Sequence, residues 1–468
     1  MVFSSLVFLG LFLPITLVIY YLLYALFRDV RWLNSILLLA SLFFYAWGEP
    51  VWVFVLIMTA LLDYGNGRRI DRYRGTWKAK VALWCSICLD LGLLFCFKYA
   101  GFAVESINQL LSVTLPVPQL TMPIGISFYT FQSLSYLLDL YWGKIAVQKK
   151  CSNYLLYIAM FPQLVAGPIV RYADIAQQLQ QRSLTLAGMQ QGITRFMCGL
   201  GKKIILANSA GEAAGLLLDS NLSQLSVAGA WLGILLYALQ IYFDFSGYSD
   251  MAIGLGRMFG FHYQENFRYP YLSCSITDFW RRWHISLGFF FRDYVYIPLG
   301  GNRRYQLRNI MVVWALTGLW HGASWNFVCW GLYYGCLLML EKKWLLHVLR
   351  MHPILGWCCT AVAVLFGWVL FYYTDFAQLQ QFLLALCGLQ SAAGWVDVRA
   401  VSVLQQYFWL LPILLVGTTP YPARLFACWR QHEFALPLVQ MTGILALGLL
   451  CLVLLVGQSY NPFLYFRF

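Results

Sequence analysis

The stretch that decides the fold of this chain runs from Asp278 to Asn326 and reads DFWRRWHISLGFFFRDYVYIPLGGNRRYQLRNIMVVWALTGLWHGASWN. It contains two histidines: His284 follows a basic pair, and His321 closes the apolar run 310–320. An ionisable side chain is costly at membrane depth, so such a residue usually has a function. The alternative is an imidazole that only hydrogen-bonds to a neighbouring helix. The arginines nearby weaken that alternative, because ionisable groups with perturbed pKa values gather at functional sites.

The same stretch carries a dense set of basic side chains, namely Arg281, Arg282, Arg292, Arg303, Arg304 and Arg308. Guanidinium groups bind phosphates bidentately. We therefore predict that Arg281, Arg282 and Arg303 bind a phosphate-bearing substrate, with Trp320 and Asn326 completing the substrate-binding set. For any single arginine, the alternative is a marker of cytoplasmic topology.

The composition excludes a soluble protein. Of the 468 residues, 61% are hydrophobic and only 11% are charged, whereas soluble domains carry about 25% charged residues. The 19 Trp and 30 Tyr fit rings anchored at the two membrane interfaces. A net charge of +13 does not indicate nucleic acid here, because membrane proteins concentrate Lys and Arg in cytoplasmic loops and near anionic lipid headgroups.

Neither the cysteines nor the histidines predict a metal site or a bound cofactor. The 13 cysteines lie mainly in apolar segments, and Cys85-Ser86-Ile87-Cys88 lacks a second ligand pair. A packed, reduced pair is therefore expected there. His284 and His321 have no acidic or thiol residues at ligand spacing. The motifs of zinc proteases, P-loop proteins and serine hydrolases are also missing from the sequence.

Hydrophobic segments predict an all-α polytopic membrane protein with about ten to twelve spans, plus re-entrant or interfacial helices. We interpret the chain as one membrane-embedded domain, 1–468. Leu6–Phe27 is too long for a signal peptide and is expected to span, leaving the N-terminus outside. A hairpin follows at 33–64, and the basic segment Arg68–Lys80 is expected to be a cytoplasmic loop, whereas 109–118 is expected outside.

Two further segments carry polar residues within apolar runs. Pro123–Tyr141 contains Gly, Ser, Gln and Asp, so it is expected to line a cavity. A span at Val227–Phe243 is followed by Asp244–Gly260, which is rich in small and acidic residues. Its glycines miss the spacing of a dinucleotide-binding fingerprint. The polar and aromatic segment His262–Ser275 is expected to be an interfacial or re-entrant loop.

These residues favour one kind of chemistry. A histidine kept neutral by apolar surroundings can act as a base near neutral pH. Such a base could remove the proton of a hydroxyl group while its oxygen attacks an acyl carbon. A membrane enzyme can draw the acyl group from cytoplasmic acetyl-CoA, whose phosphates would suit the arginines.

At this point the sequence resembles a known family. Asp278–Ser286 (DFWRRWHIS) and Gly318–Gly322 (GLWHG) are similar to the two signature segments of the membrane-bound O-acyltransferase (MBOAT) family, closest to its alginate O-acetyltransferase branch. The likeness runs along the whole chain and departs mainly in a shorter region after Tyr373. Further matching stretches are Met1–Ser5, Pro123–Phe128, Ala166–Pro168, Phe243–Asp250, Leu299–Arg303 and Gln458–Phe463.

The resemblance implies a helical bowl around a central tunnel. It implies that His321 is the invariant catalytic residue and that His284 is the second histidine at the same tunnel. The protein would lie in the inner membrane of a bacterium. Acetyl-CoA would enter the tunnel from the cytoplasmic side. The acetyl group would pass to an extracytoplasmic SGNH-type transferase and then to a polysaccharide hydroxyl. We expect membrane lipids as partners and no nucleic acid.

Two alternatives stay open. The same chemistry could serve peptidoglycan, since that branch shares the signatures. A transporter of glycans or lipid-linked sugars would belong to a different class. Transporters often show paired broken helices in two related halves, and the sequence shows no such halves. A transporter should also tolerate His321→Gln better than a base catalyst would.

Overall fold

The computed structural model of the chain describes residues 2–164, 167–389, 394–429 and 436–457. Every regular element in these ranges is a helix, so the all-α prediction is confirmed. Three of the stretches that carried the family resemblance reach beyond them, because Met1, Ala166 and 458–463 lie outside the described residues.

The chain divides into two compact units, which are described separately. Unit 1 comprises Met1–Phe196 and Ser249–Gln264, and unit 2 comprises Met197–Tyr248 and Glu265–Phe468. The single domain expected for 1–468 stays a prediction. Helices α10 (Leu186–Gly201) and α12 (Val227–Met258) have residues in both units.

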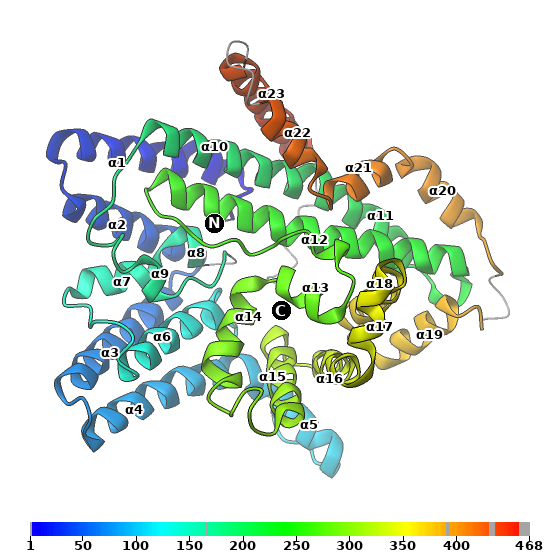
Figure 1. The fold of residues 1–468 in the computed structure, drawn as a ribbon, viewed down its shortest axis with the longest axis horizontal. Coiled ribbons are helices and arrows are strands. Elements are labelled where there is room, and N and C mark those ends of the chain that lie inside the picture. Colours follow the sequence, from blue (N-terminus) through cyan, green and yellow to red (C-terminus); the bar gives the residue numbers. More distant parts are fainter. Residues whose placement is uncertain (1, 165–166, 390–393, 430–435, 458–468) are drawn as a thin grey trace. The chain divides into compact units, whose positions relative to one another are not determined.

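Unit 1 contains the N-terminal helices, drawn from blue to cyan in Figure 1. They are η1 (Phe8–Phe12), α1 (Leu13–Phe27), α2 (Val30–Gly48), α3 (Trp52–Arg72), α4 (Trp77–Leu94), η2 (Phe95–Tyr99), α5 (Ala100–Leu111), α6 (Ile126–Tyr141), α7 (Cys151–Ala159), α8 (Phe161–Leu164) and α9 (Tyr172–Ile175).

Unit 2 contains the remaining helices, and those from α13 to α18 carry the candidate site. They are η3 (Lys202–Ala207), α11 (Asn208–Leu218), η4 (Leu222–Gln224), η5 (Pro270–Leu272), α13 (Ile276–Arg282), α14 (Ile285–Phe291), η6 (Arg292–Tyr296), α15 (Gln306–His321), α16 (Trp325–Leu340), η7 (Glu341–Leu345), α17 (Leu346–Met351), α18 (Pro353–Tyr372), α19 (Phe376–Leu386), α20 (Val398–Tyr407), α21 (Leu410–Gly417), α22 (Tyr421–Trp429) and α23 (Leu436–Gly457).

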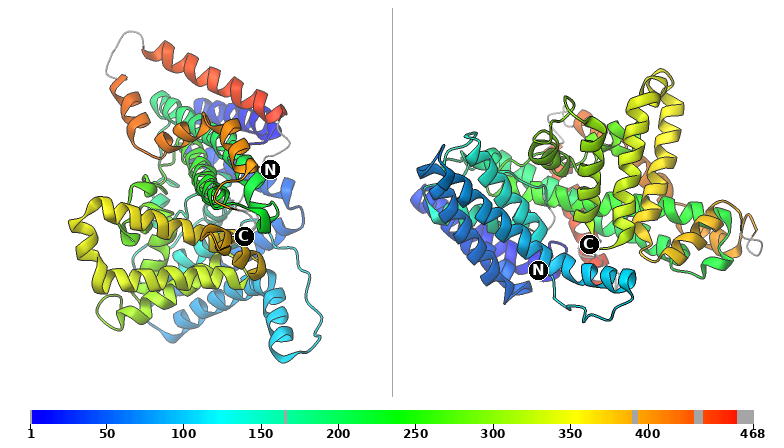
Figure 2. Two further views of the ribbon diagram at one scale, coloured as in Figure 1. Left: turned by 90° about the vertical axis from the view of Figure 1, so that its right-hand side faces the viewer. Right: turned by 90° about the horizontal axis from the view of Figure 1, so that it is seen from below.

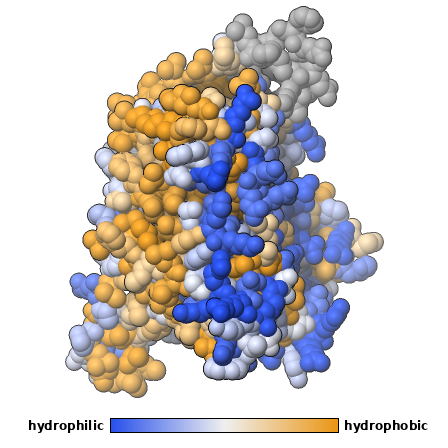
Figure 3. Space-filling view, turned by 90° about the vertical axis from the view of Figure 1, so that its left-hand side faces the viewer, coloured by the Kyte–Doolittle hydropathy of each residue, from blue (hydrophilic) through white to orange (hydrophobic). Residues whose placement is uncertain are grey.

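Several of these helices are suited to a membrane. Within the described residues, five are long and apolar enough to cross it, or six if the bent pair α20–α21 forms one span. The five are Phe8–Phe27, Val30–Gly48, Trp77–Leu111, Val227–Met258 and Pro353–Tyr372. Figure 3 shows a broad hydrophobic area beside a hydrophilic stripe on one face of the molecule, as expected where a surface passes from lipid to water. The count of ten to twelve spans stays a prediction.

The connection between α3 and α4 is shorter than the sequence suggested. Arg68–Lys80 was expected to be a basic loop, but α3 continues to Arg72 and α4 begins at Trp77, which leaves only 73–76 between them. That prediction was wrong because charged side chains at a helix end can extend into water while the backbone stays helical. The basic residues therefore lie on two helix ends.

Helix α6 is enclosed by protein. Nearly all of its residues are buried, including Gln132 and Ser135. The side chain of Ser133 lies 3.4 Å from the hydroxyl of Tyr154, and Tyr157 donates a hydrogen bond to the carbonyl of Gln132. Ser133 and the backbone carbonyl of Gln132 thus contact neighbouring tyrosines, whereas the buried side-chain amide of Gln132 has no hydrogen-bond partner among the described residues. That α6 lines a cavity stays a prediction.

Helix α12 is continuous over 32 residues. From the sequence, 227–243 was expected to span the membrane and 244–260 to form a separate polar segment. The structure joins them because Asp244 forms a buried ion pair with Lys203 (2.7 Å). Gly247 lies so close to η3 that a Cβ atom would contact the backbone of Lys203. At 1.5 Å per residue the helix is about 48 Å long, well above the roughly 30 Å of a bilayer core.

Helices α15 and α16, which lie side by side (Figure 2), form a closely packed pair. Gly318 of α15 faces Gly331 of α16. A Cβ atom on Gly318 would overlap the carbonyl oxygen of Phe327, and one on Gly331 would overlap that of Trp314. Small residues at a crossing let two backbones approach closely. The packing of this pair therefore determines the position of the C-terminal end of α15, which carries His321.

A buried carboxylate holds the start of α13. Glu341, at the end of α16, is 2% exposed and accepts hydrogen bonds from the backbone N–H groups of Ile276 (2.6 Å) and Thr277 (3.2 Å). Ser275 caps the same helix by accepting from Asp278 N (3.0 Å). Caps of this kind satisfy N–H groups that have no partner inside the helix, and a negative charge is favourable there.

Candidate active site

His321 is the last residue of α15, and aromatic rings surround it. Its side chain is 5% exposed. The ring centroids of Trp320 and Trp330 each lie 4.9 Å from its own, and that of Phe371 lies 5.4 Å away. The C-terminal end of a helix stabilises a positive charge, while the aromatic rings exclude water. This position suits a histidine that takes up a proton only during a reaction.

His284 also contacts the Trp320 indole. Its ring centroid is 5.8 Å from that of Trp320 and 4.7 Å from that of Phe245 on α12. His284 lies in the connection between α13 and α14 and is 1% exposed. One indole therefore contacts both histidines, and the structure brings together His284, Trp320 and His321. Their catalytic and binding roles stay predictions.

The backbone of His284 is strained. Its φ is 45° and its ψ is 54°, in the left-handed region that residues with a Cβ atom rarely adopt. Such conformations persist only where surrounding contacts hold them, and they cluster at functional sites. Here the contacts come from the loop after α12. Asn266 O accepts from Ile285 N (3.0 Å), and Asn266 Oδ1 lies 3.3 Å from His284 Nδ1.

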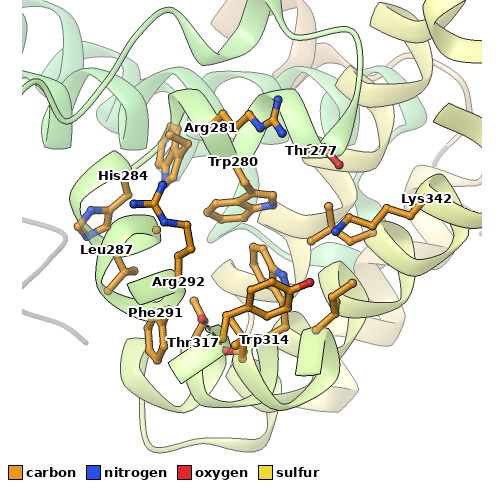
Figure 4. Close-up of a pocket in the computed structure, with 16 residues that line it drawn as sticks. Thr277, Trp280, Arg281, His284, Leu287, Phe291, Arg292, Trp314, Thr317 and Lys342 are labelled. Atoms are coloured by element: carbon orange, nitrogen blue, oxygen red, sulfur yellow. Dashed lines mark hydrogen bonds between the residues drawn. The ribbon is translucent and has the colours of Figure 1, made fainter. Parts of the chain in front are cut away.

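A cavity of about 260 Å³ opens beside His284. This volume is close to the lower end of the roughly 300–1,000 Å³ seen for ligand sites. Three cationic side chains, Arg281, Arg292 and Lys342, line it together with the indoles of Trp280 and Trp314. Figure 4 shows Lys342 extending into the cavity from the side opposite His284.

Burial and charge affect two of the lining groups. Burial lowers the pKa of His284 from 6.5 to about 3, so the imidazole is neutral at physiological pH. His284 lies outside the candidate spans. The pKa of Lys342 is also lowered, first by burial and then by the positive charge of Arg281. The cavity thus combines a neutral imidazole with Arg281 and Lys342, whose charges repel each other and favour an anionic ligand. The third cation, Arg292, is paired with Asp293 (2.7 Å).

The structure separates the predicted binding residues. Arg281 lines the cavity, but Arg282 does not and instead pairs with Asp278 (2.9 Å). Arg303 is exposed in the turn after η6. Asn326 is buried and donates from Nδ2 to the carbonyl of Leu370 (3.1 Å), which links α16 to α18. Trp320 lies between the histidines, behind the cavity lining. Neither Arg282 nor Arg303 nor Asn326 joins the cavity.

Sequence reasoning missed three residues of the site. Arg292 was noted only as part of the basic stretch, whereas Lys342 and Asn266 lie outside the stretch 278–326 altogether. Lys342 has a weak signal, as a lysine directly after an apolar helix. Asn266 has none, because a loop asparagine is common in any protein. In the described residues no group of three or more His, Cys, Asp or Glu side chains could hold a metal ion.

Comparisons with known proteins show the family of this chain. The model of the membrane-bound O-acyltransferase family matches residues 149–378, a range that contains both histidines and the cavity. A probable alginate O-acetylase of Azotobacter vinelandii is 43% identical over 79% of this chain and 75% of its own length. Another, of Pseudomonas putida, is 38% identical over the full length of both chains. A peptidoglycan O-acetyltransferase of Helicobacter pylori is 32% identical over 84% of this chain and 81% of its own.

Proposed function

Since the chain belongs to the membrane-bound O-acyltransferase family and is a multi-pass membrane O-acetyltransferase, we propose that it takes acetyl groups from cytoplasmic acetyl-CoA. It delivers them across the membrane for O-acetylation of an extracytoplasmic polysaccharide, alginate or a polymer like it. It would act in the inner membrane of a bacterium, together with an SGNH-type transferase on the outer side.

The observation that carries this proposal is the pair of imidazoles on the indole of Trp320. His284 also lines the cavity with its three cationic side chains, whereas His321 does not line it. Arg281, Arg292 and Lys342 suit the phosphates of coenzyme A. A cavity of about 260 Å³ is too small for the whole donor and would take only part of it. The indoles of Trp280 and Trp314 offer flat surfaces for its apolar parts.

The proposed reaction needs one base. His321 removes the proton of the acceptor hydroxyl, and the oxygen attacks the acetyl carbonyl carbon. A C–O bond forms and the C–S bond of the thioester breaks. The imidazolium of His321 then returns the proton to the leaving thiolate, which departs as the free thiol of coenzyme A. General base catalysis contributes about 10²- to 10⁴-fold to such a step.

The test is replacement of His321. We expect His321→Ala to lower polymer acetylation by about a hundredfold or more while the variant accumulates in the membrane. His347→Ala is the matched control, because His347 is exposed on α17 and should leave acetylation unchanged. Near-normal acetylation by His321→Ala would refute the assignment of the base. If His284→Ala abolished turnover while His321→Ala retained it, the two roles would be reversed.

A second acceptor is favoured by one observation. The relative from Helicobacter pylori is named a peptidoglycan O-acetyltransferase and shares 32% identity with this chain. The chemistry at His321 would be the same, and only the partner and polymer would change. Mass spectrometry of both polymers, from cells with and without the intact gene, decides between them.

A further inference from the structure

The oxygen of one buried amide contacts three groups around His284. Asn266 is 1% exposed. Its Oδ1 atom lies 3.2 Å from the backbone nitrogen of Ser286 and 2.9 Å from the Ser286 hydroxyl. The same atom lies 3.3 Å from Nδ1 of His284. A carboxamide can present either its oxygen or its NH2 group, so which of them faces the imidazole decides the state of the ring.

The backbone settles that choice. The N–H group of Ser286 can only donate a hydrogen bond, so the atom that faces it has to be the amide oxygen of Asn266. An oxygen has no proton to give to the imidazole. Nδ1 of His284 therefore has to carry the proton and donate it to Oδ1. In a neutral ring the lone pair then resides on Nε2.

We propose that Asn266 is a positioning residue that holds His284 in the Nδ1-protonated tautomer, so that Nε2 accepts a hydrogen bond from the substrate. This assignment rests on the proposed function, because it concerns the same site. It makes His284 an acceptor for a hydroxyl or amide N–H group of the substrate. It excludes His284 as the donor that would stabilise the oxyanion of the reaction intermediate.

The loop that carries Asn266 is built to hold this arrangement. Its backbone pairs with the chain on both sides of His284: Ile285 N donates to Asn266 O (3.0 Å), and Arg268 N donates to Arg282 O (2.9 Å). These bonds fix the loop and the strained residue His284 relative to each other. The side-chain contact is therefore preorganised rather than formed when substrate binds.

The charges around His284 favour the neutral ring. The titratable groups that line the same cavity are Arg281, Arg292, Tyr296 and Lys342, and three of them are cations. The charge of Arg292 is partly balanced by Asp293, with which it forms an ion pair (2.7 Å). From α15, His321 contacts the same indole. From α12 the contact is the uncharged ring of Phe245. A second proton on His284 would be opposed by these cations and by burial, so one nitrogen keeps its lone pair.

The first experiment compares two amides at position 284. Glutamine places its terminal amide near Nε2 and asparagine places its own near Nδ1. Asparagine tolerates the left-handed backbone better, so we expect His284→Asn to be the more stable variant. If Nε2 is the acceptor, His284→Gln should nevertheless retain about tenfold more acetyl transfer than His284→Asn. Equal activity, or higher activity for His284→Asn, would overturn the assignment.

The second experiment replaces the amide. Asn266→Asp keeps an acceptor for Nδ1–H and adds a negative charge, which raises the pKa of His284. We expect the acidic limb of the pH profile of kcat/KM to move to higher pH. Asn266→Ala removes the acceptor, so we expect kcat to fall roughly tenfold at every pH without such a shift. A purely structural role would give no movement of the limb in Asn266→Asp, and that result would refute the proposal.

Ser286→Ala is the matched control. It removes one hydrogen bond to Oδ1 and the 3.5 Å contact of the Ser286 hydroxyl with His284 Nδ1. It leaves Asn266 and the backbone donor that orients the amide, so the pH profile should stay as in the unmodified protein. His321→Ala keeps the two proposals apart. If that variant is inactive and Asn266→Asp leaves the pH profile unchanged, only the role of Asn266 fails. If His321→Ala is active, the proposed function fails independently.

Discussion

At the scale of single residues, Trp320 matters because it precedes one histidine in the chain and contacts the other in space. Its indole excludes water from both rings, and the field of a charge is stronger where water is absent. A proton taken up by His321 would therefore make protonation of His284 less favourable. We therefore expect the protonation states of the two imidazoles to be coupled.

The first residue-scale prediction concerns pH and stability. Burial lowers the pKa of His284 to about 3 in the folded protein, whereas an unfolded histidine has a pKa near 6.5. Below pH 6.5 the unfolded chain therefore binds a proton that the folded chain does not. The free energy of unfolding should fall as the pH is lowered from about 6.5 towards 3, and this contribution should be constant above that window.

Thermal unfolding of the detergent-solubilised protein across this pH range measures the effect. His284→Gln has no titrating ring at this position, so its unfolding temperature should decline less steeply with acid than that of the unmodified protein. If both proteins lost stability along the same curve, His284 would not be the buried neutral imidazole described above.

A second residue-scale prediction concerns Lys342. Lys342 lines the cavity, whereas its neighbour Lys343 stacks on Trp344 with Nζ 4.3 Å from the ring centroid. We expect Lys342→Gln to raise the KM for acetyl-CoA about tenfold, since an ionic hydrogen bond to a phosphate contributes about 1.5–3 kcal/mol. Lys343→Gln should leave the KM unchanged. Steady-state kinetics of the two variants in detergent provide the test, and a shared KM would exclude Lys342 as a phosphate ligand.

The sequence predicted part of this site for a physical reason. His284 and His321 stand out because ionisable side chains are rare in apolar surroundings. An arginine in a basic stretch does not differ from its neighbours in this way. The sequence therefore could not show that Arg281 lines the cavity while Arg282 and Arg303 do not. In the structure, Arg282 forms an ion pair with Asp278, four residues earlier in the chain. Lys342 reaches the cavity only because α16 brings η7 back towards α13, which is a tertiary effect.

At the scale of helices, the crossing of α15 and α16 positions the proposed base. Gly331→Ala would force a Cβ atom into the carbonyl oxygen of Trp314, and the helices would have to separate. We expect a loss of roughly 1–3 kcal/mol of stability and a larger loss of kcat than of substrate binding, because His321 would shift. Gly92→Ala in α4 is the control, since a Cβ atom there meets nothing within 4 Å.

Unfolding curves and kinetics of the two glycine variants measure this effect. An active and stable Gly331→Ala protein would mean that the crossing does not hold His321 in place. Gly92→Ala should be neutral or slightly more stable, because alanine is the better helix former.

Helix boundaries were the least predictable elements, and two of them show why. The basic residues after Asp63 suggested a loop, yet α3 continues to Arg72 because arginine is a good helix former. The acidic residue Asp244 suggested a break, yet α12 continues through it because Lys203 neutralises the charge. The first boundary depends on helix propensity, which the basic composition concealed. The second depends on Lys203, a partner elsewhere in the chain.

At the scale of the whole molecule, the charge distribution predicts the topology. The ends of α3 and α4 carry a basic cluster, which is Arg68, Arg69, Arg72, Arg74, Lys78 and Lys80. Such clusters stay in the cytoplasm. A reporter enzyme that is active only outside the cytoplasm should therefore be inactive when fused after Gly75. It should be active when fused after Thr114, in the connection that follows α5.

Equal reporter activity at both sites would contradict this topology. It would also remove the basis for donor entry from the cytoplasm, since the orientation of every later helix is inferred from these first ones. A reporter fused to the end of a protein that is known to face the cytoplasm is a suitable negative control.

The three cations around the cavity have a further consequence for turnover. Transfer of an acetyl group changes only the thioester end of the donor and leaves its phosphates as they were. Arg281, Arg292 and Lys342 would thus hold the spent carrier as firmly as the loaded one. Coenzyme A should then be a competitive product inhibitor, and its departure, rather than ester formation, would set the pace of the cycle.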